Sequence, residues 1–217
     1  MPSSKRKRTS QQKKGNVIER TMNLLLRKGG SSSVSTSDVC AAASLTRSSL
    51  YHYFGSKTNL MVSVHVRSIE KTLKPYLAEA ASINDPFERL TFMVRTFTSD
   101  TICLHPELRV LIHDQLTMKD KYFREVRAEW KKHYLLIRDT IAELQSRGTL
   151  NLDVKASWAA LFVLGMLTWT TYWFDYQRKD QVVALGDAAL RMVLQGLGVK
   201  GHLPLSTSIF PVPSSSE

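Results

Sequence analysis

The chain has 217 residues, 43% of them hydrophobic, and a formal net charge of +11. This apolar content is enough for a buried core and excludes a chain that is disordered throughout. Two cysteines, Cys40 and Cys103, form neither a disulfide framework nor a metal-binding spacing, and no apolar run of a signal peptide follows the basic N-terminus, so we expect a cytoplasmic protein.

The positive charge is concentrated at one end of the chain. Residues 1–57 hold 11 Lys or Arg against two acidic residues, Glu19 and Asp38, while the remainder is nearly balanced. A basic segment of this kind indicates a polyanionic partner, with nucleic acid favoured over a membrane surface. A solubilising tail would explain residues 5–8 but not the whole segment.

The N-terminal quarter reads as a polar arm followed by short helices. Residues 1–15 are basic and poor in apolar side chains, so we expect them to be disordered. Apolar residues then recur at helical spacing from Ile18 up to Gly29. Ser35 or Thr36 can cap a second helix.

Further helices follow, and we expect about nine in all, with almost no strand signal. Thr46 opens a third helix and a fourth begins near Lys57, to be kinked or ended by Pro75. Asp85 and Pro86 mark the start of the next. Pro106 begins a short helix, and apolar residues spaced three or four apart over 123–144 predict a long amphipathic one.

Residues 156–174 form an uncharged stretch that approaches the length of a membrane span. A membrane protein is therefore one alternative. The stretch also contains four Ser or Thr, and we favour a helix buried on both sides in a soluble protein, capped by Asp153. Asp180 can cap a last helix. The tail over 201–217 is rich in Pro and Ser and is expected to be disordered.

Residues 35–57 predict a helix-turn-helix. Val39, Leu45, Leu50 and Phe54 face inward and fix the angle between two short helices. The start of the second helix then presents polar groups outward, which suits a recognition helix entering the major groove of DNA. These outward residues are Arg47, Ser48, Ser49, Tyr51 and His52.

Residues 16–65 resemble the DNA-binding domain of the TetR family of bacterial repressors. The positions that fall in register with the family pattern are Gly30, Ser35, Val39, Cys40, Ala43, Leu45, Thr46, Leu50, Tyr51, Phe54 and Lys57. Three positions depart from it: Ser31 replaces an aromatic residue, Ser44 replaces the turn glycine, and Cys40 stands where alanine is usual. If Ser44 has a positive φ, it costs on the order of 1 kcal/mol.

The resemblance implies which residues contact DNA. The recognition-helix contacts would be Thr46, Arg47, Ser48, Ser49, Tyr51, His52 and Tyr53, and the phosphate contacts would be Ser35 and Lys57. The partner is then double-stranded DNA, bound by a homodimer at paired half-sites.

The resemblance continues more loosely through an all-α remainder. In the family, the last two helices of each subunit form a four-helix dimer interface, and residues 153–175 and 181–197 match them in order. The implied interface residues are Trp158, Phe162, Trp169, Trp173, Leu190, Val193, Leu194 and Leu197. Ordinary core is the alternative role for some of these.

The family's middle helices enclose a small-molecule pocket. Here its lining would be Phe92, Met93, Phe97, Cys103, Trp130, Tyr134 and Met166, although such a stripe also suits an ordinary core. The ligand would be small and hydrophobic or amphipathic, such as a lipid or an acyl thioester. The spacing of His105, Glu107, His113 and Asp114 suits no compact chelate, so we expect neither a metal nor a cofactor.

These inferences divide the chain into four parts: a disordered basic arm (1–15), a helix-turn-helix DNA-binding domain (16–62), a helical ligand-binding and dimerisation domain (63–200) and a disordered tail (201–217). The predicted function is a ligand-responsive transcriptional repressor. The alternative is a ligand-independent architectural DNA-binding protein of the same fold. No catalytic constellation stands out in the sequence, so an enzyme is not expected.

Overall fold

The computed structural model describes residues 3–117, 124–151 and 153–199, and within these ranges the chain is helical, with no strand. A single antiparallel bridge joins Leu150 to Val199. The all-α prediction is therefore confirmed. The expected tail over 201–217 and Phe123 lie outside the described residues.

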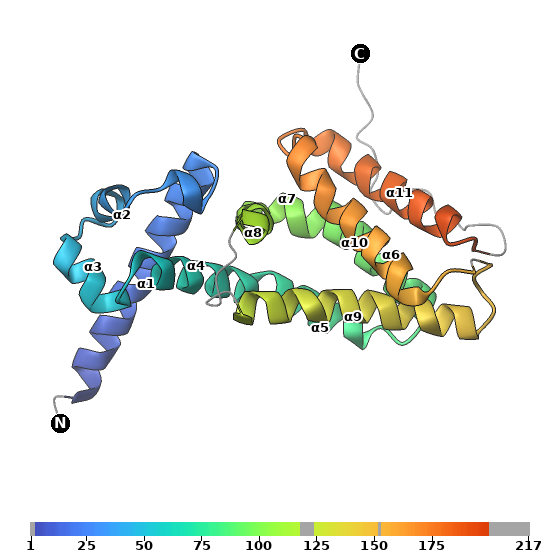
Figure 1. Ribbon diagram of the computed structural model, residues 1–217, viewed down its shortest axis with the longest axis horizontal. Helices are drawn as coiled ribbons and strands as arrows, with labels where there is room; N and C mark the ends of the chain where they lie inside the picture. Colours follow the sequence, from blue (N-terminus) through green and yellow to red (C-terminus); the bar gives the residue numbers. More distant parts are fainter. Residues whose placement is uncertain (1–2, 118–123, 152, 200–217) are drawn as a thin grey trace, which may run out of the picture.

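The chain forms a small N-terminal head and a larger helical body (Figure 1). The head contains α1 (Ser3–Lys28), a 3-10 turn η1 (Ser31–Ser33), α2 (Thr36–Ala43) and α3 (Arg47–Phe54). Helix α4 (Lys57–Lys71) begins in the head and runs into the body, where it meets α5 (Leu73–Ser82). It thus connects the two parts covalently and by packing.

The body is built around the long helix α9 (Arg124–Ser146). Helices α6 (Pro86–Thr96) and α10 (Ala156–Trp173) pack against α9, and α11 (Lys179–Gly196) packs against α6. A five-residue π-helical segment, η2 (Phe97–Thr101), continues α6 and leads through α7 (Ile102–Leu104) to α8 (Pro106–Thr117). Helix α8 also contacts α1 and α4, which places it at the junction of head and body.

Most of the predicted boundaries follow from local signals that the structure confirms. The Asp85 carboxylate accepts hydrogen bonds from the backbone N–H groups of Phe87 and Glu88 at 2.9 Å each, so it caps α6 behind Pro86. Pro106 begins α8, and α4 ends before Pro75. Each of these signals acts within a few residues of the chain, so it can be recognised from the sequence alone.

Three predictions about helix ends are wrong. Helix α1 extends back to Ser3, because the Lys, Arg and Gln residues of the expected disordered arm favour a helix once the segment from Val17 onward has nucleated it. Helix α10 begins after Lys155 without a side-chain cap, so Asp153 does not cap it. Asp180 lies inside the first turn of α11, where its charge suits the helix dipole but does not cap.

Helix α10 is not buried on both sides within the subunit. Ala159, Ala160, Val163 and Leu167 face the core, whereas the opposite face is exposed. In the described ranges, no helix combines the length and apolar character that crossing a membrane requires.

Candidate nucleic-acid interface and ligand-binding core

Caps define the start of α2, the turn between α2 and α3, and the start of α3. Ser35 and Asp38 form a reciprocal capping box at the start of α2. Ser44 adopts φ 52° and ψ 48°, the left-handed conformation expected for a turn glycine. The Thr46 hydroxyl oxygen accepts from the Ser49 backbone N–H at 3.1 Å and opens α3. The ends of the two helices therefore follow from local chemistry.

One face of α3 carries the exposed polar groups. Leu50 is completely buried beneath the helix, while Arg47, Ser48, Tyr51 and His52 are exposed on the other side. Their spacing of i, i+1, i+4 and i+5 places all four on the same surface. This surface is a row of hydrogen-bond donors and acceptors without an acidic residue.

The other predicted DNA contacts are more constrained. The Ser35 hydroxyl is exposed but lies 2.7 Å from Asp38 Oδ2, and the Ser49 hydroxyl accepts from Thr46 Oγ1 at 2.9 Å. Tyr53 is half-buried. Lys57 is also half-buried and its Nζ donates to the Ser31 carbonyl at 3.4 Å.

The charge on this face of the head remains positive. The Lys28 ammonium lies 2.8 Å from Asp38, and its hydrogen bond, together with those from Ser35, holds the pKa of that carboxyl well below its usual range. Asp38 is thus ionised and already paired. Among the described residues, the Arg47 guanidinium donates to the neutral hydroxyl of Ser37, at 3.4 Å, and to no carboxylate. It is available to a phosphate or a base edge.

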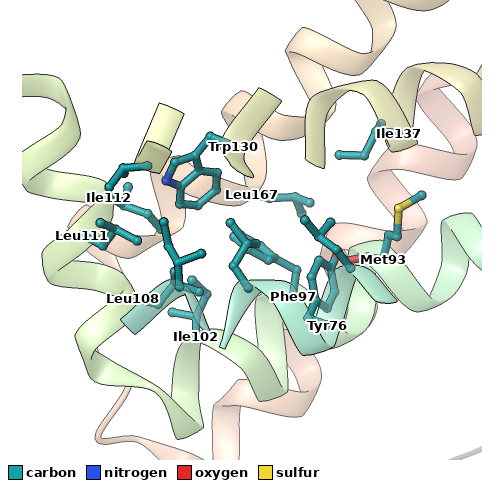
Figure 2. Packing of buried hydrophobic residues seen from close by; sticks show 14 of the residues in the cluster. Tyr76, Met93, Phe97, Ile102, Leu108, Leu111, Ile112, Trp130, Ile137 and Leu167 are labelled. Atoms are coloured by element: carbon teal, nitrogen blue, oxygen red, sulfur yellow. The ribbon is translucent and has the colours of Figure 1, made fainter. Parts of the chain in front are cut away.

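The predicted pocket residues fall partly into one aromatic cluster in the body. Figure 2 shows Tyr76, Met93, Phe97 and Trp130 gathered in the buried core. Ring centroids of Phe97 and Trp130 are 6.2 Å apart, and those of Tyr76 and Phe92 are 5.9 Å apart. Tyr134 and Met166 are half-buried beside this core, and the side chain of Cys103 is outside the described atoms.

His133 and Tyr76 belong to the same cluster and were missed from the sequence. The Tyr76 hydroxyl donates to the Met93 carbonyl at 3.0 Å, which leaves His133 Nε2–H to donate to the phenolic oxygen at 3.2 Å. His133 lies three residues after Trp130 on the buried face of α9, so helical spacing could have found it.

Two buried polar atoms of this cluster are unsatisfied. His133 Nδ1 and Trp130 Nε1 have no hydrogen-bond partner among the described residues. Complete burial lowers the pKa of His133 to about 3, so the imidazole is neutral at physiological pH. Unpartnered polar groups in an apolar core are costly and mark positions where a ligand or water can bind.

The aromatic cluster is nevertheless closed to solvent, since Met93 and Phe97 are fully buried. A shallow apolar groove of about 420 Å³ lies nearby between α5 and α9. Its lining includes Leu77, Ala81 and Leu136, and none of the predicted pocket residues. A ligand that reached the cluster would have to separate packed side chains.

A continuous apolar stripe covers the outer face of α10. Trp158, Phe162, Trp169 and Trp173 are 55%, 75%, 58% and 76% exposed. Leu161, Gly165 and Tyr172 lie on the same face, so the exposed positions repeat with a helical period. Val183 and Met192 of α11 add exposed apolar area. Large contiguous patches of this kind mark interaction surfaces.

Four residues predicted for the same interface lie instead in the core of the subunit. Leu190, Val193, Leu194 and Leu197 are each at most 4% exposed. Leu190, Val193 and Leu194 lie on α11, which packs against α6 and η2, and Leu197 directly follows this helix. The apolar pattern of α11 therefore contributes to the core of the subunit.

Both the head and the body of the chain match models of known protein families. Residues 18–64 match a model described as bacterial regulatory proteins of the tetR family, and residues 84–197 match the tetracyclin repressor-like C-terminal domain. No curated protein matches the chain.

Several solved structures share the fold. A TetR family transcriptional regulator, PfmR from Thermus thermophilus, has a TM-score of 0.70 at 22% identity, over 83% of this chain and 98% of that one. AibR in complex with isovaleryl coenzyme A and operator DNA has a TM-score of 0.71 at 20% identity, over 86% and 99%. FadR from Bacillus subtilis in complex with stearoyl-CoA has a TM-score of 0.67 at 15% identity, over 83% and 97%.

Proposed function

Because the chain belongs to the TetR family of DNA-binding transcription regulators, we propose that it is a homodimeric repressor released from a palindromic operator by a small ligand. The exposed polar face of α3 is the observation that supports this proposal most directly. The proposed domain division is a helix-turn-helix head over residues 16–62 and a ligand-binding and dimerisation body from residue 63 onward.

In the proposed complex, α3 lies in the major groove. Arg47 pairs with a guanine edge, while Tyr51 and His52 donate to base edges or phosphates. Lys57 lies at the N-terminus of α4 and contacts a backbone phosphate, where the helix dipole also favours an anion. Ser35, Thr46, Ser48, Ser49 and Tyr53 complete the proposed contact set.

Selection of bound duplexes from a random library tests this assignment. We expect a palindromic motif to be enriched. Arg47→Ala should relax the preference at one base position in each half-site, whereas Lys57→Ala should weaken all sequences alike. Arg138→Ala, on an exposed part of α9, is the matched control and should bind normally. Retention of DNA without a shared motif would contradict sequence-specific recognition.

The outer face of α10 supports the proposed dimer. Three tryptophan side chains and one phenylalanine side chain are exposed on this face of the subunit. A twofold pairing of the stripe with a second copy would bury them. Gly165 lies in the middle of the stripe, and a Cβ there would meet no atom of the subunit within 4 Å. A helix from a second copy could therefore approach closely at this point.

The oligomeric state of charge variants tests the dimer. Phe162→Asp and Trp173→Asp should shift the protein to monomer in analytical ultracentrifugation, because each places a carboxylate in a desolvated interface. Leu104→Asp is the matched control, since Leu104 is 71% exposed but lies outside the stripe. Dimers that survive both stripe variants would contradict the assignment.

The proposed ligand-binding region is the aromatic cluster around Phe97, Trp130 and His133. Two observations support it: the unsatisfied atoms His133 Nδ1 and Trp130 Nε1, and the π-helical segment that starts at Phe97. The acyl-CoA complexes of AibR and FadR suggest an acyl thioester as the ligand class. Binding would require the cluster to open, as in a minor conformation selected by the ligand.

Isovaleryl-CoA and stearoyl-CoA are suitable probes, with free CoA as the control. A ligand of the folded state should raise the melting temperature and reduce the occupancy of the selected operator. His133→Leu should abolish the thermal response while DNA binding persists.

A second function, ligand-independent architectural binding, is favoured by the complete burial of Met93 and Phe97, which closes the aromatic cluster to solvent. It predicts no thermal response to either acyl-CoA and an operator occupancy that neither ligand changes. Bending of the bound duplex, measured by circular permutation, would then be the property to compare with that of the repressor model.

A further inference from the structure

A buried carboxylate of the body is hydrogen-bonded to the head. Asp114 lies on α8, and its Oδ1 accepts from the backbone N–H of Ser31 at 3.0 Å. Its Oδ2 accepts from the Ser31 hydroxyl and lies 2.9 Å from His65 Nε2 on α4. Asp114, Ser31 and His65 are 4%, 1% and 0% exposed. Three elements far apart in the sequence therefore meet at one carboxylate.

The local shape of the head is adapted to this contact. Gly30 has φ 128°, which only glycine adopts readily, and a Cβ at this position would lie 2.8 Å from Asp114 Oδ1. Ser31 then supplies both a backbone and a side-chain donor. The serine that departs from the family's aromatic residue thus has a specific partner 83 residues away.

The carboxylate is well stabilised where it lies. Burial alone would raise the pKa of Asp114, but the hydrogen bonds from His65 and Ser31 outweigh it and hold the pKa below its ordinary value. A buried carboxylate that loses one of its donors is strongly destabilised. The contact therefore favours one arrangement of head and body over neighbouring ones.

Ser31 also contacts a residue of the proposed DNA-contacting surface. The Ser31 carbonyl accepts from Lys57 Nζ at 3.4 Å, so the Ser31 residue lies between Asp114 and a proposed phosphate contact. At the preceding position of α8, the His113 ring stacks on Tyr172 of α10 with centroids 3.9 Å apart. Helix α8 thus contacts both the head and the helix that carries the apolar stripe.

We propose that the contact of Asp114 with Ser31 is an interdomain latch that sets the orientation of the head and passes movement of α8 to the operator-binding surface. The role in operator binding rests on the proposed function, whereas the positioning of the head does not. While the latch is closed, Ser31 and Lys57 stay in place. When α8 moves, Asp114 loses its hydrogen bonds to Ser31 and His65 in one step. The head therefore changes between two discrete orientations instead of moving gradually.

Hydrogen exchange of the DNA-free protein tests the latch without reference to function. In Ser31→Ala and Asp114→Asn, we expect faster exchange of peptides spanning residues 30–57 and unchanged exchange in α9 and α11. Ser33→Ala and Asp139→Asn are matched controls on exposed positions and should leave both regions unchanged. Ser31→Ala removes only a hydroxyl, so it remains informative if Asp114→Asn fails to fold.

Operator affinity provides the second readout. Each latch variant should bind the selected operator roughly 5-fold to 150-fold more weakly, the usual range of coupling between sites. The double variant should be no weaker than the worse single variant, because both changes break the same contact. Unchanged exchange of residues 30–57, an equal increase throughout the protein, or additive losses of affinity would each overturn the proposal. A protein that binds no operator would refute the proposed function and leave the exchange result to decide the latch.

Discussion

His133 predicts a specific loss of stability in mild acid. Burial lowers its pKa from the ordinary value of 6.5 to about 3 in the folded protein. As the pH falls below 6.5, the unfolded chain takes up a proton that the folded protein excludes. The stabilisation of the folded state is therefore fully present above the unfolded pKa and is lost as the pH falls toward the folded one.

The magnitude follows from the separation of the two pKa values. Each pH unit between them is worth about 1.4 kcal/mol, so the free energy of unfolding should fall by about 3 kcal/mol between about pH 6.5 and about pH 4.5 from this residue alone. For a chain of this size, that corresponds to a decrease of roughly 5–10 °C in melting temperature. His133→Gln should remove this part of the pH dependence, because the amide does not titrate and retains a donor.

Chemical denaturation of both proteins at about pH 7 and about pH 4.5 gives the comparison. Carboxylates titrate in both proteins, so only the difference between their pH dependences reports on His133. His105→Gln is the control, since its imidazole is partly exposed, unlike that of His133. An identical pH dependence in wild type and His133→Gln would refute the inference that the imidazole is buried in its neutral form.

Three further changes in the head have expected outcomes. Ser44→Gly should raise the free energy of unfolding by about 1 kcal/mol in urea denaturation, because Ser44 has a positive φ; a decrease would contradict this conformation. Thr46→Ala should lower it by about 1 kcal/mol through loss of the α3 cap, and an unchanged midpoint would show that the cap contributes little. Lys57→Ala should reduce the slope of log affinity against log salt by about 1 in fluorescence titrations, whereas an unchanged slope would remove Lys57 from the phosphate contacts.

The sequence by itself determined the class of fold and the position of the helix-turn-helix. The capping box at Ser35, the Thr46 cap and the Asp85–Pro86 pair act within a few residues, and their signals survive in any tertiary context. The helical period of the apolar residues likewise fixed which side of α3 is buried. Local chemistry is sufficient where both partners of an interaction lie in the same short segment.

Only the tertiary structure decided which apolar residues are accessible. Trp173 and Leu190 both occupy apolar positions in the last two helices, yet one is 76% exposed and the other 4%, because α11 packs against α6 and η2 whereas most of the outer face of α10 is left uncovered in the described part of the subunit. Composition and period do not distinguish these two cases.

The structure also decided the contacts between distant segments. His133 is buried because α5 and α6 pack against α9 and the rings of Tyr76 and Phe97 contact its imidazole. Asp114 meets Ser31 only because α8 folds back against the head. Charged and polar groups in such positions look like solvated surface residues in the sequence. Their partners are brought together by packing of whole helices, and this information is spread over the entire core and is absent from the spacing around any one residue.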